Sequence, residues 1–302
     1  MMPRWLLWTL LAIACWGVWA VIPTEIGTAL SAQQQQALCT IGLLPLLCIL
    51  PFQPEPASAE NKRRGCWVSL AAGVCSSLGN LPYFALLSRG ENAATVVPLA
   101  AMYPLVTVLL AVVLLKERMN LVQLLGLVLS MAAIYLFNVA QDAGSGFINR
   151  WLLIALIPIG LWGTAGLLQK VATHYVGGAY SALWFHLAFI PIGLFLYWRE
   201  PMTAAISVKH WALVLTLGLT LALGNLAVLA AFACGGRAAI ITPLAGLYPL
   251  VSLPIALWYF GNDINQRQGF GIACALLAVA MLTYETAPKP APAVEPATEP
   301  LA

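Results

Sequence analysis

Ten stretches without a charged side chain follow one another along this sequence. Each can supply a helix of about 17–25 residues, which at about 1.5 Å per residue crosses a hydrocarbon layer of about 30 Å. Only 8% of the residues are charged and 61% are hydrophobic, which a soluble protein of this size could not enclose. We therefore predict an all-α integral membrane protein with ten transmembrane helices, within Trp5–Thr24, Ile26–Pro54, Gly65–Ser88, Asn92–Leu115, Met119–Gln141, Trp151–Gln169, Tyr175–Trp198, Trp211–Gly236, Ala238–Asn262 and Gln268–Tyr284.

The flanking charges indicate how the chain enters the membrane. Arg4 precedes an apolar run that resembles a secretory signal, but Cys15-Trp16-Gly17 stands where a cleavage site would lie, so we interpret the run as the first span. With the N-terminus inside, nine Lys or Arg residues fall on the inner side and five on the outer side. Because basic residues favour the cytoplasmic side, we predict a multi-pass protein of the plasma (inner) membrane with both termini in the cytoplasm.

The two halves of the chain repeat one pattern. An offset of 145 residues lays residues 79–126 on 224–271 without a gap, and brings a Gly-Asn pair, a proline, a Tyr-Pro pair, a glutamine and a glycine into register. An offset of 146 also pairs Trp16-Gly17 with Trp162-Gly163. Since each half holds five spans, an odd number, the second half enters the membrane from the opposite side, as in the inverted repeats of secondary transporters. We predict repeats at 5–141 and 150–285, then a disordered Pro/Ala-rich tail at 286–302.

The stretch "PLAAMYPLVTVLLAVVLLKERMNLVQLLGLVLSMAAIYL" carries a family resemblance. It combines a helix with Pro98 and Tyr103-Pro104, a charged turn at Lys116-Glu117-Arg118, and a helix that opens with Gln123-x-x-Gly126. In this it is similar to the end of an EamA domain, the repeat unit of the drug/metabolite transporter superfamily. The resemblance implies two such domains over nearly all of residues 5–285, and a substrate among amino acids, sugars, nucleotide sugars, cations or drugs. The second copy departs from the pattern, since Gly261-Asn262-Asp263 replaces the charged turn.

Several polar and aromatic residues in the predicted spans are candidates for a central cavity between the repeats. Asn80 and Asn225 stand beside glycines, where interhelical hydrogen bonding and substrate contact are both open. The paired tyrosines and tryptophans sit away from the headgroup region that usually explains aromatic residues in membranes, so cavity lining and packing are both open for them. Together the candidates are Trp16, Asn80, Tyr83, Tyr103, Thr107, Trp162, Asn225, Tyr248 and Ser252.

Four prolines are candidate hinges: Pro98, Pro104, Pro243 and Pro249. A proline removes the donor that the carbonyl four residues earlier would use. We expect the carbonyls of Ala100 and Ala245 to need a neighbouring helix, a side chain, water or a ligand.

Ionisable residues within the spans are scarce. Glu25, Lys170 and His186 are the candidates for coupling transport to an ion, although Glu25 and Lys170 could equally reach the interface and His186 could be a neutral imidazole bonded to a neighbouring helix. No hydrolase, metalloprotease or phosphate-loop motif occurs, and no Cys-x-x-Cys pair or Cys/His spacing typical of a metal site. We therefore predict no enzyme, no cofactor and no metal.

These observations favour a secondary transporter that moves a small metabolite or drug-like solute by alternating access. The expected partners are that solute and the lipid bilayer, with no nucleic acid, and the protein is expected as a monomer or homodimer. A lipid scramblase, a channel-like protein and a non-transporting membrane scaffold are the alternatives.

Overall fold

The computed structural model describes residues 3–52, 61–114, 116, 119–141, 150–173, 175–202, 205–234, 244–282 and 284. Every regular element in these residues is a helix, which confirms the all-α prediction. The helices are α1 (Arg4–Ile26), α2 (Ala32–Ile49), α3 (Lys62–Ser88), α4 (Ala93–Ala100), α5 (Pro104–Leu114), α6 (Leu121–Gln141), α7 (Arg150–Thr173), α8 (Gly178–Leu187), α9 (Phe189–Arg199), α10 (Val208–Ala233), α12 (Pro249–Pro254) and α13 (Gln266–Leu282), with short turns η1 (Gly27–Ala29), η2 (Leu50–Phe52) and η3 (Ile255–Tyr259).

Seven of the described segments are long and apolar enough to cross a membrane, with α4 and α5 forming one segment and α8 and α9 another. The three other predicted spans correspond to shorter apolar helices at Leu121–Leu136, Pro249–Tyr259 and Gln266–Leu282. Large apolar side chains point outward from the bundle, among them Val113 and Trp198, which are 71% and 73% exposed. An apolar outer surface of this kind suits lipid rather than water. The chain is therefore a membrane protein with several transmembrane helices.

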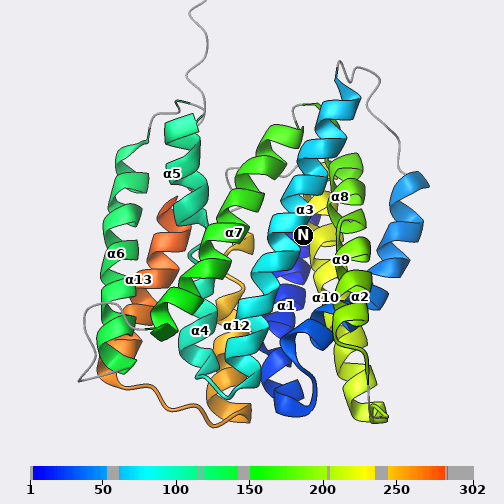
Figure 1. The fold of residues 1–302 in the computed structure, drawn as a ribbon. Coiled ribbons are helices and arrows are strands. Elements are labelled where there is room, and N and C mark those ends of the chain that lie inside the picture. The colour runs from blue at the N-terminus through cyan, green and yellow to red at the C-terminus, as the bar shows by residue number, and fades with distance from the viewer. Residues whose placement is uncertain are drawn as a thin grey trace, which may run out of the picture.

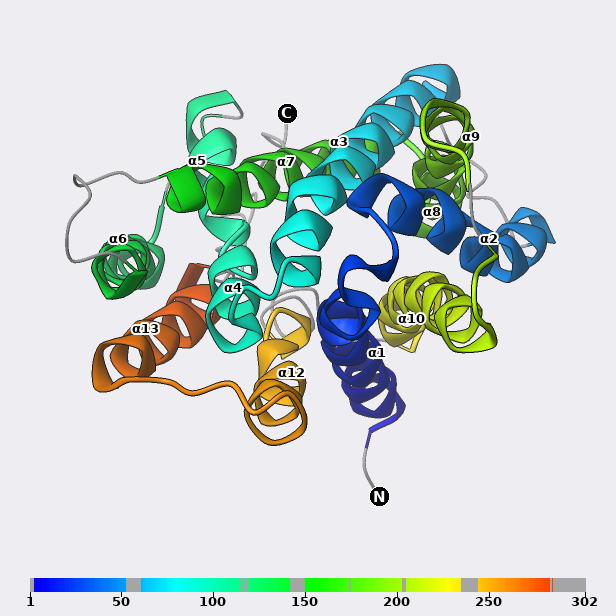
Figure 2. The same cartoon turned by 60° about the horizontal axis from the view of Figure 1, so that its bottom comes forward.

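The main helix contacts join the first half of the chain to the second. α3 packs along α7, α1 along α10, and α6 along α13. Figure 1 shows α5, α6 and α13 on one side of the molecule and α2, α8 and α9 on the other. In Figure 2, turned by 60°, α1, α4 and α12 lie between these groups. Because each half buries its apolar faces against the other, the core belongs to both halves together.

The helix that contains Pro98 and Pro104 breaks where the sequence predicts a bend. α4 ends at Ala100, residues 101–103 form a turn, and α5 begins at Pro104. The Ala100 carbonyl, deprived of its helical donor by Pro104, accepts from the Tyr103 N–H at 3.2 Å.

The second half contains the same turn, closed by the same backbone hydrogen bond. The Ala245 carbonyl accepts from the Tyr248 N–H at 3.3 Å, and α12 begins at Pro249. The expectation that a neighbouring helix, a side chain, water or a ligand must satisfy these carbonyls was therefore wrong, because the backbone N–H of each tyrosine bonds the carbonyl of the alanine three residues earlier. The predicted hinge at Pro243 lies outside the described residues.

Helices α2 and α10 approach most closely at a pair of glycines. A Cβ added to Gly218 would overlap the carbonyl oxygen of Cys39 and lie 2.8 Å from the Cα of Gly42. A Cβ at Gly42 would lie 2.6 Å from the Leu215 carbonyl oxygen. Small residues allow helix backbones to pack this tightly in membranes, where dispersion contacts rather than water exclusion hold helices together.

We expect Gly218→Ala to lower the thermal stability of the purified protein by several degrees, because the new methyl group meets backbone atoms that cannot rotate away. Gly160→Ala is the matched control, since Gly160 is also helical and nothing lies within 4 Å of an added Cβ there. The control should be neutral or stabilising, because alanine favours a helix by about 1 kcal/mol over glycine. Equal melting temperatures for the two variants would contradict the close approach.

Candidate functional site

Four aromatic rings, three from helices and one from the turn between α4 and α5, gather at the centre of the bundle. Trp19 of α1 stacks on Tyr83 of α3 at 5.5 Å between ring centroids, and Trp162 of α7 lies 5.2 Å from Tyr83 and 5.7 Å from Trp19. The Tyr83 hydroxyl donates to the Ala20 carbonyl at 2.6 Å, and its ring is fully buried. Tyr103 joins the cluster edge-on to Trp162 at 6.4 Å. Edge-to-face and offset rings of this spacing attract one another.

Two tryptophan–tyrosine contacts have almost the same geometry. Trp162 meets Tyr103 with centroids 6.4 Å apart and ring planes at 86°, and Trp16 meets Tyr248 at 6.5 Å and 85°. In both contacts the tryptophan comes from one half of the chain and the tyrosine from the other. The residues of the second contact are those that the repeat offset pairs with the first.

Two glycines allow each tryptophan to pack this closely: one in the opposite half, against the indole ring, and one directly after the tryptophan in the sequence. An added Cβ at Gly79 would lie 2.7 Å from the Trp162 ring, and one at Gly224 would overlap the Trp16 ring. The glycine after each tryptophan is equally constrained: a Cβ at Gly163 would lie 2.6 Å from the Tyr103 carbonyl oxygen. At Gly17 the corresponding distance is 3.0 Å, to the Tyr248 carbonyl oxygen. Each Trp-Gly pair therefore fits between a glycine and a tyrosine of the opposite half.

Asn80 is fully engaged in a buried hydrogen-bond network. Its amide nitrogen donates to the Gln36 side-chain oxygen at 3.0 Å, and its amide oxygen accepts from the Trp162 indole N–H at 3.2 Å. The Gln36 amide nitrogen in turn donates to the Ser77 hydroxyl at 2.9 Å. Gln36 and Ser77 are inaccessible to solvent and Asn80 is 2% exposed. Asn80 therefore makes interhelical hydrogen bonds within the protein, which is one of the two roles that the sequence left open for it.

Asn225 occupies the equivalent position in the second half, but its partners differ. Its amide nitrogen lies 2.7 Å from Nε2 of His186. Nδ1 of His186 lies 2.7 Å from the Ala182 carbonyl, which can only accept, so Nδ1 carries the hydrogen and Nε2 accepts from Asn225. This is the arrangement of a neutral imidazole. Asn225 is half-buried, and its amide oxygen has no hydrogen-bond partner in the part of the chain that the structure describes.

The indole N–H of Trp16 is also left without a partner. It is enclosed, and no acceptor among the described residues reaches it. The corresponding N–H of Trp162 has two acceptors, the Asn80 amide oxygen and the Ser76 carbonyl, both at 3.2 Å. Asn80 and the Trp162 indole N–H thus bond to each other and to nearby protein groups. Among the described residues, no partner reaches the Asn225 amide oxygen or the Trp16 indole N–H.

The hydroxyls that follow the two tyrosines lie against backbone. Thr107 donates to the Gly163 carbonyl at 2.8 Å, which ties α5 to α7. Ser252 is fully buried and donates to the Pro249 carbonyl at 3.3 Å, within its own helix. The shared spacing of these hydroxyls in the sequence does not lead to a shared partner.

Of the candidate coupling residues, Glu25 has a cationic partner. Lys209, at the start of α10, lies 2.6 Å from its carboxylate, with side-chain exposures of 64% and 22% for Lys209 and Glu25. The pair joins α1 to α10 at the end of the bundle where α1 finishes. Lys170 belongs to α7, but its side chain lies outside the described part. The coupling roles of Glu25, Lys170 and His186 remain predictions.

A comparison with protein-family models finds a match in the first half of the chain. Trp16, Asn80 and Tyr103 all lie within residues 3–139, which match the EamA-like transporter family. These residues therefore resemble an EamA domain. No curated protein matches the chain.

A solved crystal structure, described only as that of a protein, resembles this chain over nearly its whole length. It aligns with 93% of this chain and 96% of its own, at a TM-score of 0.62 and 17% sequence identity. At that identity the likeness concerns the fold alone. The overall fold of this chain is therefore shared with a known structure.

Sequence reasoning missed Gln36 as a member of the site. The run Gln33–Gln36 is absent from the predicted site residues, yet Gln35 and Gln36 are fully buried in α2. Ser31 caps this helix: its hydroxyl accepts from the Gln34 N–H at 3.2 Å, and the Gln34 side chain accepts from the Ser31 N–H at 3.1 Å. A serine followed three residues later by glutamine signals a helix start, and that signal would have placed Gln36 inside the helix.

We expect Gln36→Leu to destabilise the protein, because it leaves the Asn80 amide and the Ser77 hydroxyl buried without their partner. Losing one partner of a buried hydrogen bond costs about 1–3 kcal/mol, which is measurable by thermal unfolding in detergent. Gln33→Leu is the control, since it makes the same change at an exposed position of α2. If the two variants unfold at the same temperature, the network does not hold α2 to α3.

Proposed function

We propose that this chain is a secondary transporter that moves a small solute across the plasma (inner) membrane by alternating access. In this proposal ten helices form two inverted five-helix repeats, both termini are cytoplasmic, and the solute binds between the repeats. The observation that carries it is the duplicated contact in which Trp16 meets Tyr248 and Trp162 meets Tyr103 at matching distances and angles. The match of residues 3–139 to the EamA-like transporter family supports the same conclusion.

The duplicated contact suits a carrier for a physical reason. Alternating access needs two states of similar energy that open to opposite sides. If the halves are related by an inverted repeat, each half can adopt the conformation that the other half now has. The surroundings of the two tryptophan–tyrosine contacts are then swapped, and the protein opens to the opposite side. Each contact lies directly beside a Tyr-Pro turn whose hydrogen bond is internal to the turn. The helices can therefore bend at these turns while the backbone stays satisfied.

The unsatisfied groups of the second half mark where the solute binds. The Asn225 amide oxygen offers an acceptor, and the nearby Trp16 indole offers a donor once the surrounding helices move. Every buried polar side chain in the described residues is uncharged, being Ser, Thr, Asn, Gln or His. A site of this composition favours a neutral, zwitterionic or amphipathic solute over a strongly charged one.

The direct test begins with a thermal-shift screen of the purified protein against a broad metabolite panel. Solutes that stabilise the protein are then assayed for uptake into liposomes that contain it. The proposal expects saturable uptake of at least one neutral, zwitterionic or amphipathic solute. Uptake of strongly charged solutes only would contradict the proposed substrate class. Rapid movement of fluorescent lipids without solute uptake would show that the protein is a scramblase instead.

We expect Asn225→Ala to raise the KM for the transported solute about tenfold while the melting temperature falls little. Asn80→Ala should show the opposite pattern, with a lower melting temperature because the Gln36 and Trp162 partners lose their bonds. The two variants remove the same amide at positions that the repeat pairs, so each controls for the other. Equal effects on KM would show that the difference between the halves has no bearing on substrate binding.

We also expect Pro104→Ala to slow transport more than it reduces membrane insertion. Alanine restores the helical donor for the Ala100 carbonyl and straightens the break between α4 and α5. Uptake rate per inserted molecule is the measurement, with insertion quantified from the same membranes. A proportional loss of both would indicate that the break serves assembly alone.

A further inference from the structure

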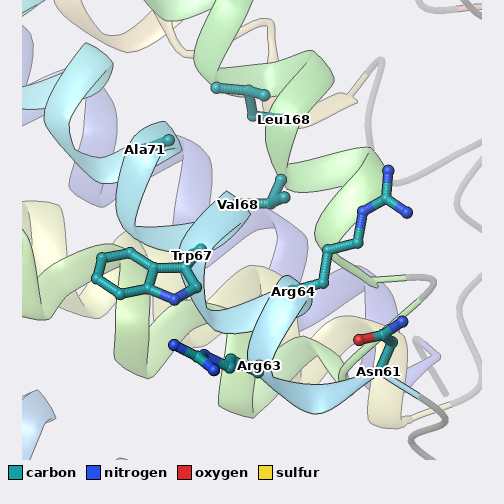
Figure 3. A pocket seen from close by; sticks show the side chains of 7 residues that line it. All are labelled: Asn61, Arg63, Arg64, Trp67, Val68, Ala71 and Leu168. Carbon is teal, nitrogen blue, oxygen red and sulfur yellow. The ribbon is translucent and has the colours of Figure 1, made fainter.

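A pocket of about 440 Å³ lies at the ends of α3 and α7, away from the central aromatic rings. It forms where the first turns of α3 meet the last turns of α7, and Figure 3 shows its side chains. Its lining divides into a polar part and an apolar part: Asn61, Arg63 and Arg64 in one, and Trp67, Val68, Ala71 and Leu168 in the other.

The polar part carries an excess of positive charge in an unfavourable place. Lys62, Arg63 and Arg64 are all exposed and all belong to the first turn of α3. The N-terminus of a helix already bears a partial positive charge, so cations there repel it, whereas an anion is attracted by both. In the described part of the chain, neither Arg63 nor Arg64 has a carboxylate partner.

Aromatic rings from the turn that follows α7 and from the start of α8 lie under two of these cations. The Arg64 guanidinium lies over the Tyr175 ring at 5.1 Å, and the Lys62 ammonium over the Tyr180 ring at 5.5 Å. The α3 backbone lies close to this turn at Gly65, where an added Cβ would lie 2.9 Å from the Tyr175 side chain. An arginine stacked on a ring keeps the N–H groups at its edge free for a phosphate.

The apolar part points to a lipid rather than a free anion. Trp67 is 63% exposed one turn beyond Arg63, and Figure 3 shows the two side chains next to each other. Tryptophan favours the headgroup level of a bilayer, where its ring is apolar and its N–H is hydrated. Ala71 is exposed and Leu168 half-buried, and both continue the wall along helices of membrane-spanning length. A phosphate with an attached acyl chain matches a basic end joined to an apolar wall.

We propose that this pocket binds an anionic phospholipid, with its phosphate at Arg63 and Arg64 and its acyl chain along Trp67 and Leu168. Basic pockets between transmembrane helices bind acidic headgroups by the same combination of charge and apolar contact. The proposal is independent of transport, since none of these residues belongs to the central site.

The test uses the full-length protein purified in detergent. Bound lipid is counted by native mass spectrometry in titrations with phosphatidylglycerol and with phosphatidylcholine of identical chains. We expect phosphatidylglycerol to bind at least tenfold tighter than phosphatidylcholine. The double variant Arg63→Gln/Arg64→Gln should lose about 30-fold in affinity for phosphatidylglycerol, from about 1 kcal/mol for each cation near an anionic surface.

The matched control is Arg89→Gln/Arg199→Gln, which removes the same charge from exposed positions at the ends of α3 and α9. It should keep the wild-type preference. Trp67→Ala should weaken both lipids and leave their ratio unchanged, which tests the apolar wall even if the double arginine variant fails to fold.

Three results would overturn the proposal. The first is equal affinity of the wild-type protein for both lipids, and the second is an Arg63→Gln/Arg64→Gln variant that keeps the preference for phosphatidylglycerol. Displacement of phosphatidylglycerol by inorganic phosphate at constant ionic strength would show that the pocket takes a free anion instead.

Discussion

The packing of a tryptophan from each half against a glycine of the other half is the contact on which this structure depends. Trp162 packs on Gly79 and Trp16 packs on Gly224, so each half contributes one tryptophan and one glycine to the interface between the halves. Around these contacts α3 packs along α7 and α1 along α10. A methyl group at either glycine would overlap the indole ring of the opposite half, so that the ring or its helix would have to shift. The tyrosines at the proline breaks contact the same indoles, so each break in a helix lies directly beside one of these tryptophan–glycine contacts.

The two halves share this framework but differ in their polar chemistry. In the first half, Gln36 of α2 satisfies Asn80, and the resulting network is sealed from solvent. In the second half, His186 of α8 takes the place of that glutamine, and within the described residues no partner reaches the Asn225 amide oxygen or the Trp16 indole N–H. The repeat therefore preserves the position of the asparagine without preserving its hydrogen-bond partners.

Much of the fold follows from the sequence because hydropathy and repeat spacing act over long stretches. Residue types predicted the all-helical architecture and the break at Tyr103-Pro104. The repeat offset predicted that Trp16 and Trp162 occupy equivalent positions in the two halves. The partners of Asn80 and Asn225 were not, since Gln36 and His186 come from helices whose packing angle no local pattern encodes. The partner of the Ala100 carbonyl was misjudged for a different reason. The proline rule states which donor is lost, while the turn that replaces it depends on the φ and ψ angles of Ala101 and Met102. The lengths of α6 and α13 and the course of the chain from α12 into η3 likewise depend on tertiary contacts.

The turn η3 makes the two tyrosine-bearing segments unequal in a way that the repeat alone does not suggest. After α12 the backbone winds more loosely through Ile255–Tyr259, with the Phe260 N–H reaching back five residues to the Ile255 carbonyl at 3.2 Å. The equivalent part of the first half continues as the regular helix α5. A wider turn carries its side chains around the helix axis by a smaller angle per residue, so the register of the second segment drifts relative to the first. The two tyrosine-bearing segments therefore match at their tryptophan–tyrosine contacts and differ along Ile255–Tyr259, where the side chains face other directions around the helix axis than their counterparts in α5.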